Sequence, residues 1–315
     1  MEKKKLKFAF YWAASCGGCE IAVLDINEKI LDVVANVDIV FWPVAIDIKY
    51  KDVEAMPDES IDVCFFNGAI RTSEQEHLAK LLRSKSKVLV AFGSCACDGC
   101  VVGLANLWDK ETVFERAYSE TPSTKNPEFV TPQTSLKVKE GELVLPDFFD
   151  TVKTLDQTVD VDYYLSGCPP PVPLIAQAVE AIFKNELPPK GSNLMPTKSI
   201  CDECPREKKD RKLSEIKRIY EIDDDFETCF WDQGVICMGP ATRAGCGAQC
   251  PNVNVPCTGC DGPGPRVTDQ GAAAISALAS IATNPEVINQ AVDPIGTFYK
   301  YSLAHSILRR KVMKK

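Results

Sequence analysis

The 315-residue chain lacks several features that would assign it to a membrane or exported class of protein. It has no run of about 18 apolar residues, which a membrane-spanning helix requires. The opening MEKKKLKFAF is basic but has no long apolar core before a small-residue cleavage site. We therefore expect neither a signal peptide nor a twin-arginine leader. No solenoid repeat and no low-complexity tract is found, and we expect a cytoplasmic protein without a membrane partner.

An excess of positive charge is also missing. The chain has 36 Lys and Arg against 44 Asp and Glu, with a formal net charge of −8. Nucleic-acid-binding domains are usually basic, so we expect no nucleic-acid partner. The only basic cluster lies at the end, where residues 297–315 are expected to form an extended segment passing into a short basic helix.

Cysteine, in contrast, is abundant, with 15 residues. A reducing compartment keeps thiols reduced, and an odd count fits a closed disulfide framework poorly, so metal binding is the better explanation. Eight cysteines lie between 201 and 260 among many Gly and Pro residues. Eight thiolates are enough for two four-thiolate sites, which is how iron–sulfur clusters are held.

The first 190 residues alternate short apolar runs with amphipathic stretches. Alternation of this kind predicts an α/β fold with a doubly wound parallel sheet, and five strands suit the flavodoxin-like order 2-1-3-4-5. The predicted strands are 6–12, 37–42, 61–68, 87–93 and 161–167, and the predicted helices are 20–35, 73–85 and 172–185. Residues 105–158 are expected to be an insertion, with a hairpin turn near 138–142.

Four cysteines follow three of these strands. Cys16 and Cys19 come after the first, Cys95 after the fourth and Cys168 after the fifth. Ligands in such sheets bind beyond the carboxyl ends of the strands, so these thiols are expected to form a third cluster site. Cys97 and Cys100 lie beside Cys95, and geometry alone leaves open which of the three is the ligand.

A Pro-, Gly- and Ser-containing linker over 186–199 predicts a domain boundary, giving domains 1–190 and 191–315. In the second domain, 206–226 is expected to be a solvated helix and loop. Residues 227–268 are expected to be irregular, with metal in place of a hydrophobic core, and to fold only with metal bound. Residues 269–284 predict a helix buried in a core or, preferably, at an interface.

The ordered motifs SCGGCE (15–20), FGSCA (92–96), SGCPPP (166–171), CDEC (201–204), CFWDQGVICMGPATRAGC (229–246) and PCTGC (256–260) resemble those of the small, electron-transferring subunit of nickel–iron hydrogenases. The similarity covers almost the whole chain. It is greatest to the cytoplasmic, methyl-viologen-reducing type of methanogenic archaea, which does not reduce the deazaflavin coenzyme.

The resemblance implies three 4Fe–4S clusters. We name the ligand groups after their implied positions. The proximal set is Cys16, Cys19, Cys95 and Cys168; the medial set is Cys246, Cys250, Cys257 and Cys260; the distal set is Cys201, Cys204, Cys229 and Cys237. Exported hydrogenases have histidine where Cys201 stands and three cysteines at the medial site, so potentials cannot be transferred from them.

The resemblance also implies an electron-relay subunit of an H2:acceptor oxidoreductase, with no catalytic residue of its own. The nickel–iron centre would lie in a partner large subunit. Electrons would leave through a small iron–sulfur adaptor subunit to heterodisulfide reductase.

Three alternatives stay open. The chain could be the small subunit of the deazaflavin-reducing hydrogenase, or a complex-I-like relay subunit, although the latter class usually ends soon after the GCPP helix. Structural zinc could also occupy paired CxxC motifs. Among single residues, Cys64 is expected to be a buried apolar side chain. Glu20 could relay protons, but a carboxylate stabilised by a helix start explains it better.

Overall fold

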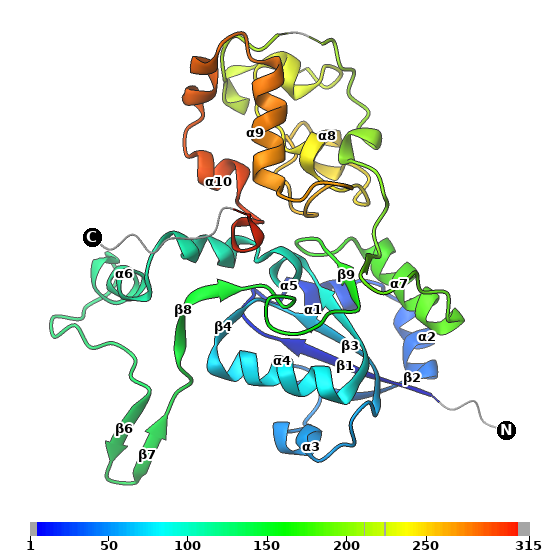
Figure 1. Ribbon diagram of the computed structural model, residues 1–315, viewed down its shortest axis with the longest axis vertical. Helices are drawn as coiled ribbons and strands as arrows, with labels where there is room; N and C mark the ends of the chain where they lie inside the picture. The colour runs from blue at the N-terminus through cyan, green and yellow to red at the C-terminus, as the bar shows by residue number, and fades with distance from the viewer. Residues whose placement is uncertain (1–4, 211, 224, 308–315) are drawn as a thin grey trace.

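A six-stranded parallel sheet forms the centre of the N-terminal part of the chain (Figure 1). The computed structural model describes residues 5–210, 212–223 and 225–307. The spatial order is β2-β1-β3-β5-β9-β10, so the flavodoxin-like order predicted for five strands is confirmed. The strands are Leu6–Trp12 (β1), Val37–Phe41 (β2), Ile61–Asn67 (β3), Ser86–Phe92 (β5), Tyr163–Leu165 (β9) and Ser192–Asn193 (β10).

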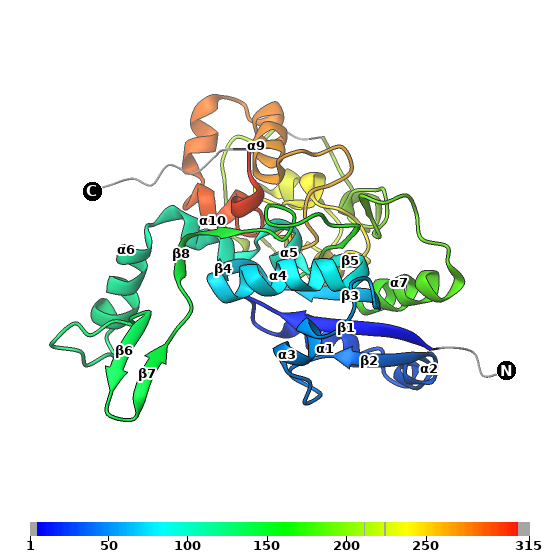
Figure 2. The same cartoon turned by 60° about the horizontal axis from the view of Figure 1, so that its bottom comes forward.

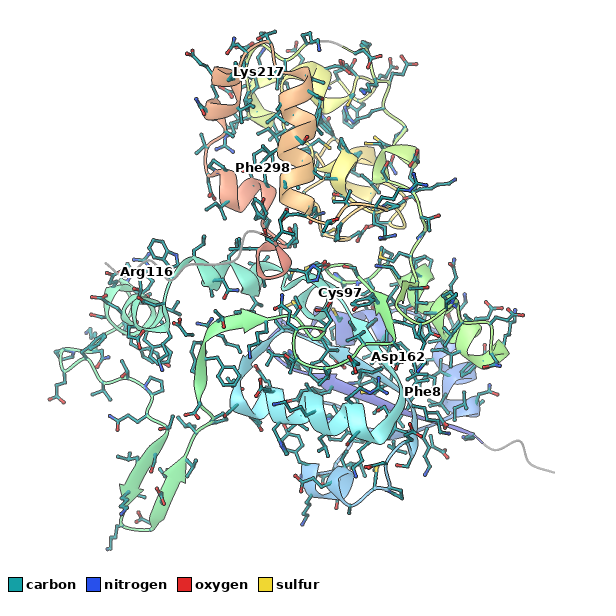
Figure 3. The ribbon with its side chains drawn as sticks, viewed as in Figure 1. Phe8, Cys97, Arg116, Asp162, Lys217 and Phe298 are labelled. Atoms are coloured by element: carbon teal, nitrogen blue, oxygen red, sulfur yellow. The ribbon has the colours of Figure 1, made fainter. Side chains whose placement is uncertain are left out.

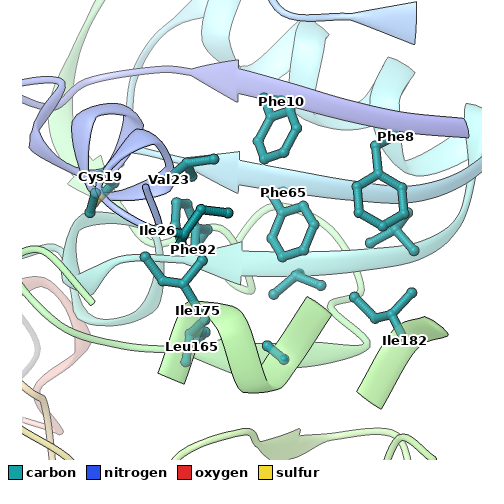
Figure 4. Packing of buried hydrophobic residues seen from close by; sticks show 14 of the residues in the cluster. Phe8, Phe10, Cys19, Val23, Ile26, Phe65, Phe92, Leu165, Ile175 and Ile182 are labelled. Carbon is teal, nitrogen blue, oxygen red and sulfur yellow. The ribbon is translucent and has the colours of Figure 1, made fainter. Parts of the chain in front are cut away.

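Helices cover both faces of this sheet, which confirms the doubly wound class. Successive residues of a strand point to opposite faces. Phe8 and Phe10 of β1 accordingly pack in the cluster beneath the first group of helices, whereas Ala9 and Tyr11 pack on the other side (Figure 4). The first group is α1 (Gly18–Leu24), α2 (Lys29–Asn36) and α7 (Val172–Lys184); the second is α3 (Tyr50–Glu54), α4 (Ser73–Lys85) and α5 (Ser94–Asp98).

The helix predicted over 20–35 is wrong as one continuous element. It is divided into α1 and α2 by a turn in which Asn27 has φ 56. Asn tolerates this left-handed conformation better than most side chains, so it ends the first helix.

The insertion over 105–158 decorates the sheet and carries its own short elements. The hairpin is confirmed, since Val138 pairs with Gly141 across a two-residue turn. Figures 1 and 2 both show it projecting away from the sheet. A small antiparallel pair of strands that we did not predict anchors the insertion. The elements are α6 (Lys110–Glu115), β6 (Ser135–Val138), β7 (Gly141–Val144) and β8 (Phe148–Lys153), which pairs with β4 (Ile70–Thr72).

Residues 197–307, which we call the cysteine-rich region, contain little regular structure in their described part. The helix predicted at 269–284 is confirmed as α9 (Gln270–Ile281), beside α8 (Gln249–Asn252) and α10 (Pro294–Phe298). The solvated helix expected within 206–226 is wrong. The described residues form one short 3-10 turn, Ile219–Glu221, and isolated bridges to 228 and 235, because the segment runs alongside those loops.

The expectation that metal replaces a hydrophobic core in this region is also wrong. Phe230 and Met238 of the loops pack with Leu278 of α9 and Phe298 of α10, and all four are buried. Phe298 is labelled in Figure 3. Helix α9 therefore packs in the core of its own region rather than needing an interface. The division into domains 1–190 and 191–315 stays a prediction.

The segment 299–305 returns to the sheet region, which we define as residues 5–193. The backbone N–H of Cys100 donates to the Tyr301 carbonyl at 2.9 Å, and Gln157 Nε2 donates to the Ala304 carbonyl at 2.9 Å. The basic helix predicted beyond 307 lies outside the described residues. In the described part of the chain, no helix has both the length and the apolar character needed to cross a membrane.

Candidate metal centres

The proximal set gathers where β1, β5 and β9 end. Cys16 lies in the loop after β1, Cys19 in the first turn of α1, Cys95 in the first turn of α5, and Cys168 directly after Gly167 beyond β9. The loop before α1 packs on Trp12, whose indole N–H donates to the Ser15 carbonyl at 3.2 Å. The topology thus delivers all four predicted thiols to one edge of the sheet.

Close backbone approach shapes this site. A Cβ at Gly93, which has φ +83, would lie 2.3 Å from the Cys19 sulfur. Only glycine can occupy that position without displacing the thiol. The backbone N–H of Gly18 points at the Cys16 sulfur at 3.5 Å, the kind of hydrogen bond that cluster sulfurs receive. These features match what a buried inorganic cluster requires of its loop.

The structure separates the three cysteines that the sequence left unassigned. Cys64 is wholly buried in β3, as predicted. The Cys97 thiol is turned into the core and donates to the Ala91 carbonyl at 3.3 Å (labelled in Figure 3). The Cys100 thiol is instead 3.6 Å from the Cys168 sulfur and also within hydrogen-bonding reach of Cys95. Of the two cysteines that the sequence left open beside Cys95, Cys100 therefore lies against the proximal set and Cys97 does not.

Glu20 is buried beside this edge. Its carboxylate accepts a hydrogen bond from the Trp42 indole N–H and faces Asn67. Burial raises its pKa above the ordinary value, against the lowering effect of the Trp42 and Asn67 contacts. Glu20 lies in the first turn of α1, as the helix-start explanation requires, and it is buried as well.

The distal set lines one cavity of about 360 Å³ in the cysteine-rich region. Cys201, Cys204, Cys229 and Cys237 all contribute to its wall, together with Cys257 of the medial set. A Cβ at Gly239 would lie 3.1 Å from the Cys201 sulfur and 3.6 Å from that of Cys237. The Trp231 indole N–H holds the loop by donating to the Cys237 carbonyl at 2.8 Å. All four predicted distal cysteines thus converge.

The medial set is organised around Asp261. Its carboxylate interacts with the thiols of Cys246 and Cys260, the latter at 3.7 Å. Cys257 is buried and neighbours Cys260, whereas Cys250 lies exposed in α8. Gln270 Nε2 fixes the loop by donating to the Gly259 and Gly262 carbonyls at 2.9 and 3.0 Å.

Burial disfavours the thiolate form at several cysteines of these sites. It raises the pKa of the Cys201 thiol to about 12, and those of Cys237 and Cys246 to about 11. It likewise raises the pKa of the Asp261 carboxyl to about 6. Metal ligands must be deprotonated, so loading these sites releases protons and a cationic centre is needed to stabilise the thiolates.

Two hydrogen bonds join loops of the three sets. Ser94, next to Cys95, donates its hydroxyl to the Cys260 carbonyl, joining the proximal and medial loops. The backbone N–H after Cys237, that of Met238, donates to the Cys257 carbonyl at 2.8 Å and joins the distal and medial loops. The medial loops therefore contact loops of both other sets.

Buried polar side chains fix the loops of the cysteine-rich region to one another. Arg206 donates to the carbonyls of Asp225 and Thr228 at 2.8 and 2.9 Å and to Asn254 Oδ1 at 2.6 Å. Its guanidinium also lies 3.9 Å from the centre of the Phe230 ring. Glu203 accepts from the N–H groups of Gly245 and Gly247 at 3.1 and 2.9 Å. Side chains thus link distal and medial loops that no sheet connects.

Among the described residues, no group of three or more His, Cys, Asp or Glu is arranged as a site for a single metal ion. The donor set of the three sites is thiolate throughout, and glycines at Gly93 and Gly239 leave space beside the sulfurs. Thiolate sets of this kind fit iron–sulfur clusters.

Comparison with known proteins gives matches over most of the chain. Residues 16–182 match the family model described as NADH ubiquinone oxidoreductase, 20 Kd subunit. The iron–sulfur subunit of the F420-non-reducing hydrogenase of Archaeoglobus profundus is 45% identical over 98% of this chain and 99% of its own length. The corresponding F420-non-reducing hydrogenase subunit of Methanothermobacter marburgensis is 38% identical over 99% of this chain and 98% of its own.

A solved structure supports the fold. A chain of the recombinant NiFeSe hydrogenase from Desulfovibrio vulgaris Hildenborough superimposes with a TM-score of 0.52 at 15% identity, covering 83% of this chain and 95% of that one. The family model ends within α7, so the cysteine-rich region is an addition to the unit which that model describes.

Proposed function

The chain belongs to the family of F420-non-reducing hydrogenase iron–sulfur subunits, and from this premise we propose that it carries three 4Fe–4S clusters and relays electrons from H2 oxidation. Iron–sulfur clusters supply one-electron acceptance and donation. The observation that carries the proposal is the presence of three thiol groups whose loops are joined by the Ser94 and Met238 hydrogen bonds.

Each set would hold one cluster with residues already named. The proximal, medial and distal cysteines would be the ligands, and Gly93 and Gly239 would leave the space beside them. The protein's part is to exclude water and position the ligands. Asp261 adds negative charge near the medial set, which would lower its potential, and Glu203 orients the medial loop through the N–H groups that it binds.

We propose a large hydrogenase subunit, holding the nickel–iron centre, as the partner at the proximal end. A small iron–sulfur adaptor and heterodisulfide reductase would accept electrons at the distal end. The buried Glu20 lies beside the proximal set and would serve protons at that subunit boundary rather than electrons.

Metal content tests the proposal first. The chain is purified anaerobically with whatever co-purifies, and iron, acid-labile sulfide, zinc and nickel are measured per chain. We expect about twelve iron and about twelve sulfide from three four-iron clusters, with about one nickel from the partner.

The other results separate the alternatives. Two or three zinc without labile sulfide would leave a structural scaffold. About four iron alone would support only the proximal site and favour a complex-I-like relay. Twelve iron with a co-purifying subunit that reduces the deazaflavin coenzyme would identify the sibling hydrogenase.

A further inference from the structure

The proximal site holds one sulfur more than a four-iron cluster can use. Cys100 is 2% exposed and its thiol contacts both Cys168, at 3.6 Å between sulfurs, and Cys95. Five thiols therefore meet where four ligands are required. Cys97, two residues from Cys95, shows that a surplus cysteine in this loop can be turned into the core instead.

The backbone holds Cys100 in a conformation that side chains rarely adopt. Its φ is 50 and its ψ −155, and its N–H is fixed by the Tyr301 carbonyl at 2.9 Å. Glycine would occupy this position without the backbone strain that other residues carry there. A thiol maintained at such a position, and directed at another thiol, indicates a role for the sulfur itself.

Each iron of a four-iron cluster offers the protein one coordination position. The sulfurs of Cys100 and Cys168, 3.6 Å apart, lie in contact and would therefore compete for the same iron of the cluster. We propose that Cys100 is a reserve ligand that can replace Cys168 at the proximal cluster. This inference rests on the proposed function, because it requires a cluster at the proximal set.

The exchange needs no oxidant or reductant. The bond from iron to the Cys168 sulfur breaks as one from iron to the Cys100 sulfur forms. The proton of the Cys100 thiol passes to the departing Cys168 sulfur along the contact between them. Cluster charge and electron count stay the same, and the two forms differ only in whether Cys168 or Cys100 is the ligand of that iron.

The test is rescue of iron binding. Cys168→Ala is prepared as the anaerobic complex and compared with Cys168→Ala/Cys100→Gly and with Cys16→Ala. Alanine is used because serine can itself bind iron, and Cys100→Gly relieves the backbone strain, so it should not unfold the loop. Iron is counted, the reduced clusters are recorded by electron paramagnetic resonance, and free thiols are alkylated and mapped by mass spectrometry.

We expect Cys168→Ala to keep about twelve iron with an altered proximal signal, and Cys100 to resist alkylation while the clusters are bound and to react once chelation has removed them. The double variant and Cys16→Ala should each fall to about eight. Cys168→Ala/Cys97→Ala is the matched control and should behave as Cys168→Ala does.

Two results would overturn the inference. Iron in Cys168→Ala could fall to the level of the double variant, in which case Cys100 does not bind. Alternatively, Cys100→Gly alone could lose the proximal cluster, which would make Cys100 the resting ligand. If the unmodified chain itself contains no iron–sulfur cluster at the proximal set, the proposed function fails instead, and the two failures are distinct.

Discussion

The sheet region and the cysteine-rich region bring thiols together by different means. In the sheet region, parallel strands end at one edge and deliver Cys16, Cys95 and Cys168 there, with backbone hydrogen bonds made inside the sheet. In the cysteine-rich region, loop carbonyls are instead satisfied by buried side chains such as Arg206 and Gln270. Regular structure thus positions the first site, whereas the loops of the other two are held by a few polar side chains and by the buried core of their own region.

Removal of the clusters should separate the two regions most strongly. We expect chelation under anaerobic conditions to lower hydrogen-exchange protection most in the cysteine-bearing loops of the cysteine-rich region, while α9 keeps part of its protection from its own core and β1, β3 and β5 remain protected. The reason is that buried thiols lose their cation there and little regular structure remains. Hydrogen exchange read by mass spectrometry measures this. Equal loss in both regions would show that the sheet also depends on metal.

Gly93→Ala should remove the proximal cluster alone. The added Cβ would lie 2.3 Å from the Cys19 sulfur, so about four of twelve iron should be lost. Gly191→Ala is the matched control, because Gly191 has a similar φ of +86 but no heavy atom within 4 Å of the added Cβ. It should carry the same backbone strain, about 1–3 kcal/mol, and retain all its iron. Equal iron loss in the two variants would attribute the effect to strain rather than to the thiol.

Arg206→Met should loosen the cysteine-rich region while leaving the sheet intact. The change keeps much of the side chain's volume over Phe230 but removes the donor to the part-buried Asp225 carbonyl and one of two donors to the Thr228 carbonyl, which keeps Gln233 Nε2 at 2.8 Å. A buried acceptor left unpaired costs about 1–3 kcal/mol, so the free energy of unfolding should fall by more than a surface change lowers it.

Denaturant unfolding with region-specific hydrogen exchange measures the Arg206 effect. Lys209→Met is the control, since Lys209 is exposed and donates to Thr228 Oγ1 at 2.7 Å, and it should change stability by less than about 0.5 kcal/mol. A loss confined to β1 and β3 would contradict the assignment of Arg206 to the loops.

The smallest expected effect is a pH dependence at the junction of the two regions. The hydrogen bond to Asp156, 3.4 Å away, raises the pKa of His305, and the carboxylates of Asp98 and Asp269 act in the same direction. The stabilisation is complete below the ordinary histidine pKa of about 6.5 and is lost as pH rises through the raised value. His305→Gln should abolish this dependence of Tm between about pH 6 and 8, and His77→Gln should not. An unchanged pH dependence of Tm in His305→Gln would show that the His305–Asp156 pair does not stabilise the junction.

The sequence was sufficient for the sheet because its signals are local. A short apolar run such as IDVCFFNG predicts a strand from its own residues alone. Because parallel strands end at the same edge of the sheet, the cysteines that come directly after them are expected at that edge. The break at Asn27 escaped prediction because a polar residue on a helix face and one in a left-handed turn look alike in sequence. Charged residues over 206–226 suggested a helix, but bridges to Thr228 and Val235, made by residues of that segment, hold it extended.

The site was predictable to the level of motif spacing and no further. CxxC pairs contain half of the twelve predicted thiols, but whether a sulfur faces the site or the core depends on one backbone turn. Cys97 and Cys100 are three residues apart and point to different environments because Gly99 and Cys100 both take positive φ. The roles of Ser94, Arg206 and Gln270 come from contacts across many residues, which no local pattern contains.

The return of residues 299–305 to the sheet region also has a kinetic meaning. The hydrogen bond from Cys100 to Tyr301 joins positions about two hundred residues apart, and contacts of such long separation form late in folding. Until they form, the loop that carries Cys100 lacks its contact with residues 299–305. Cluster assembly machinery would therefore find the proximal thiols most accessible on a chain whose C-terminal segment has not yet docked, and closure of that segment would follow loading.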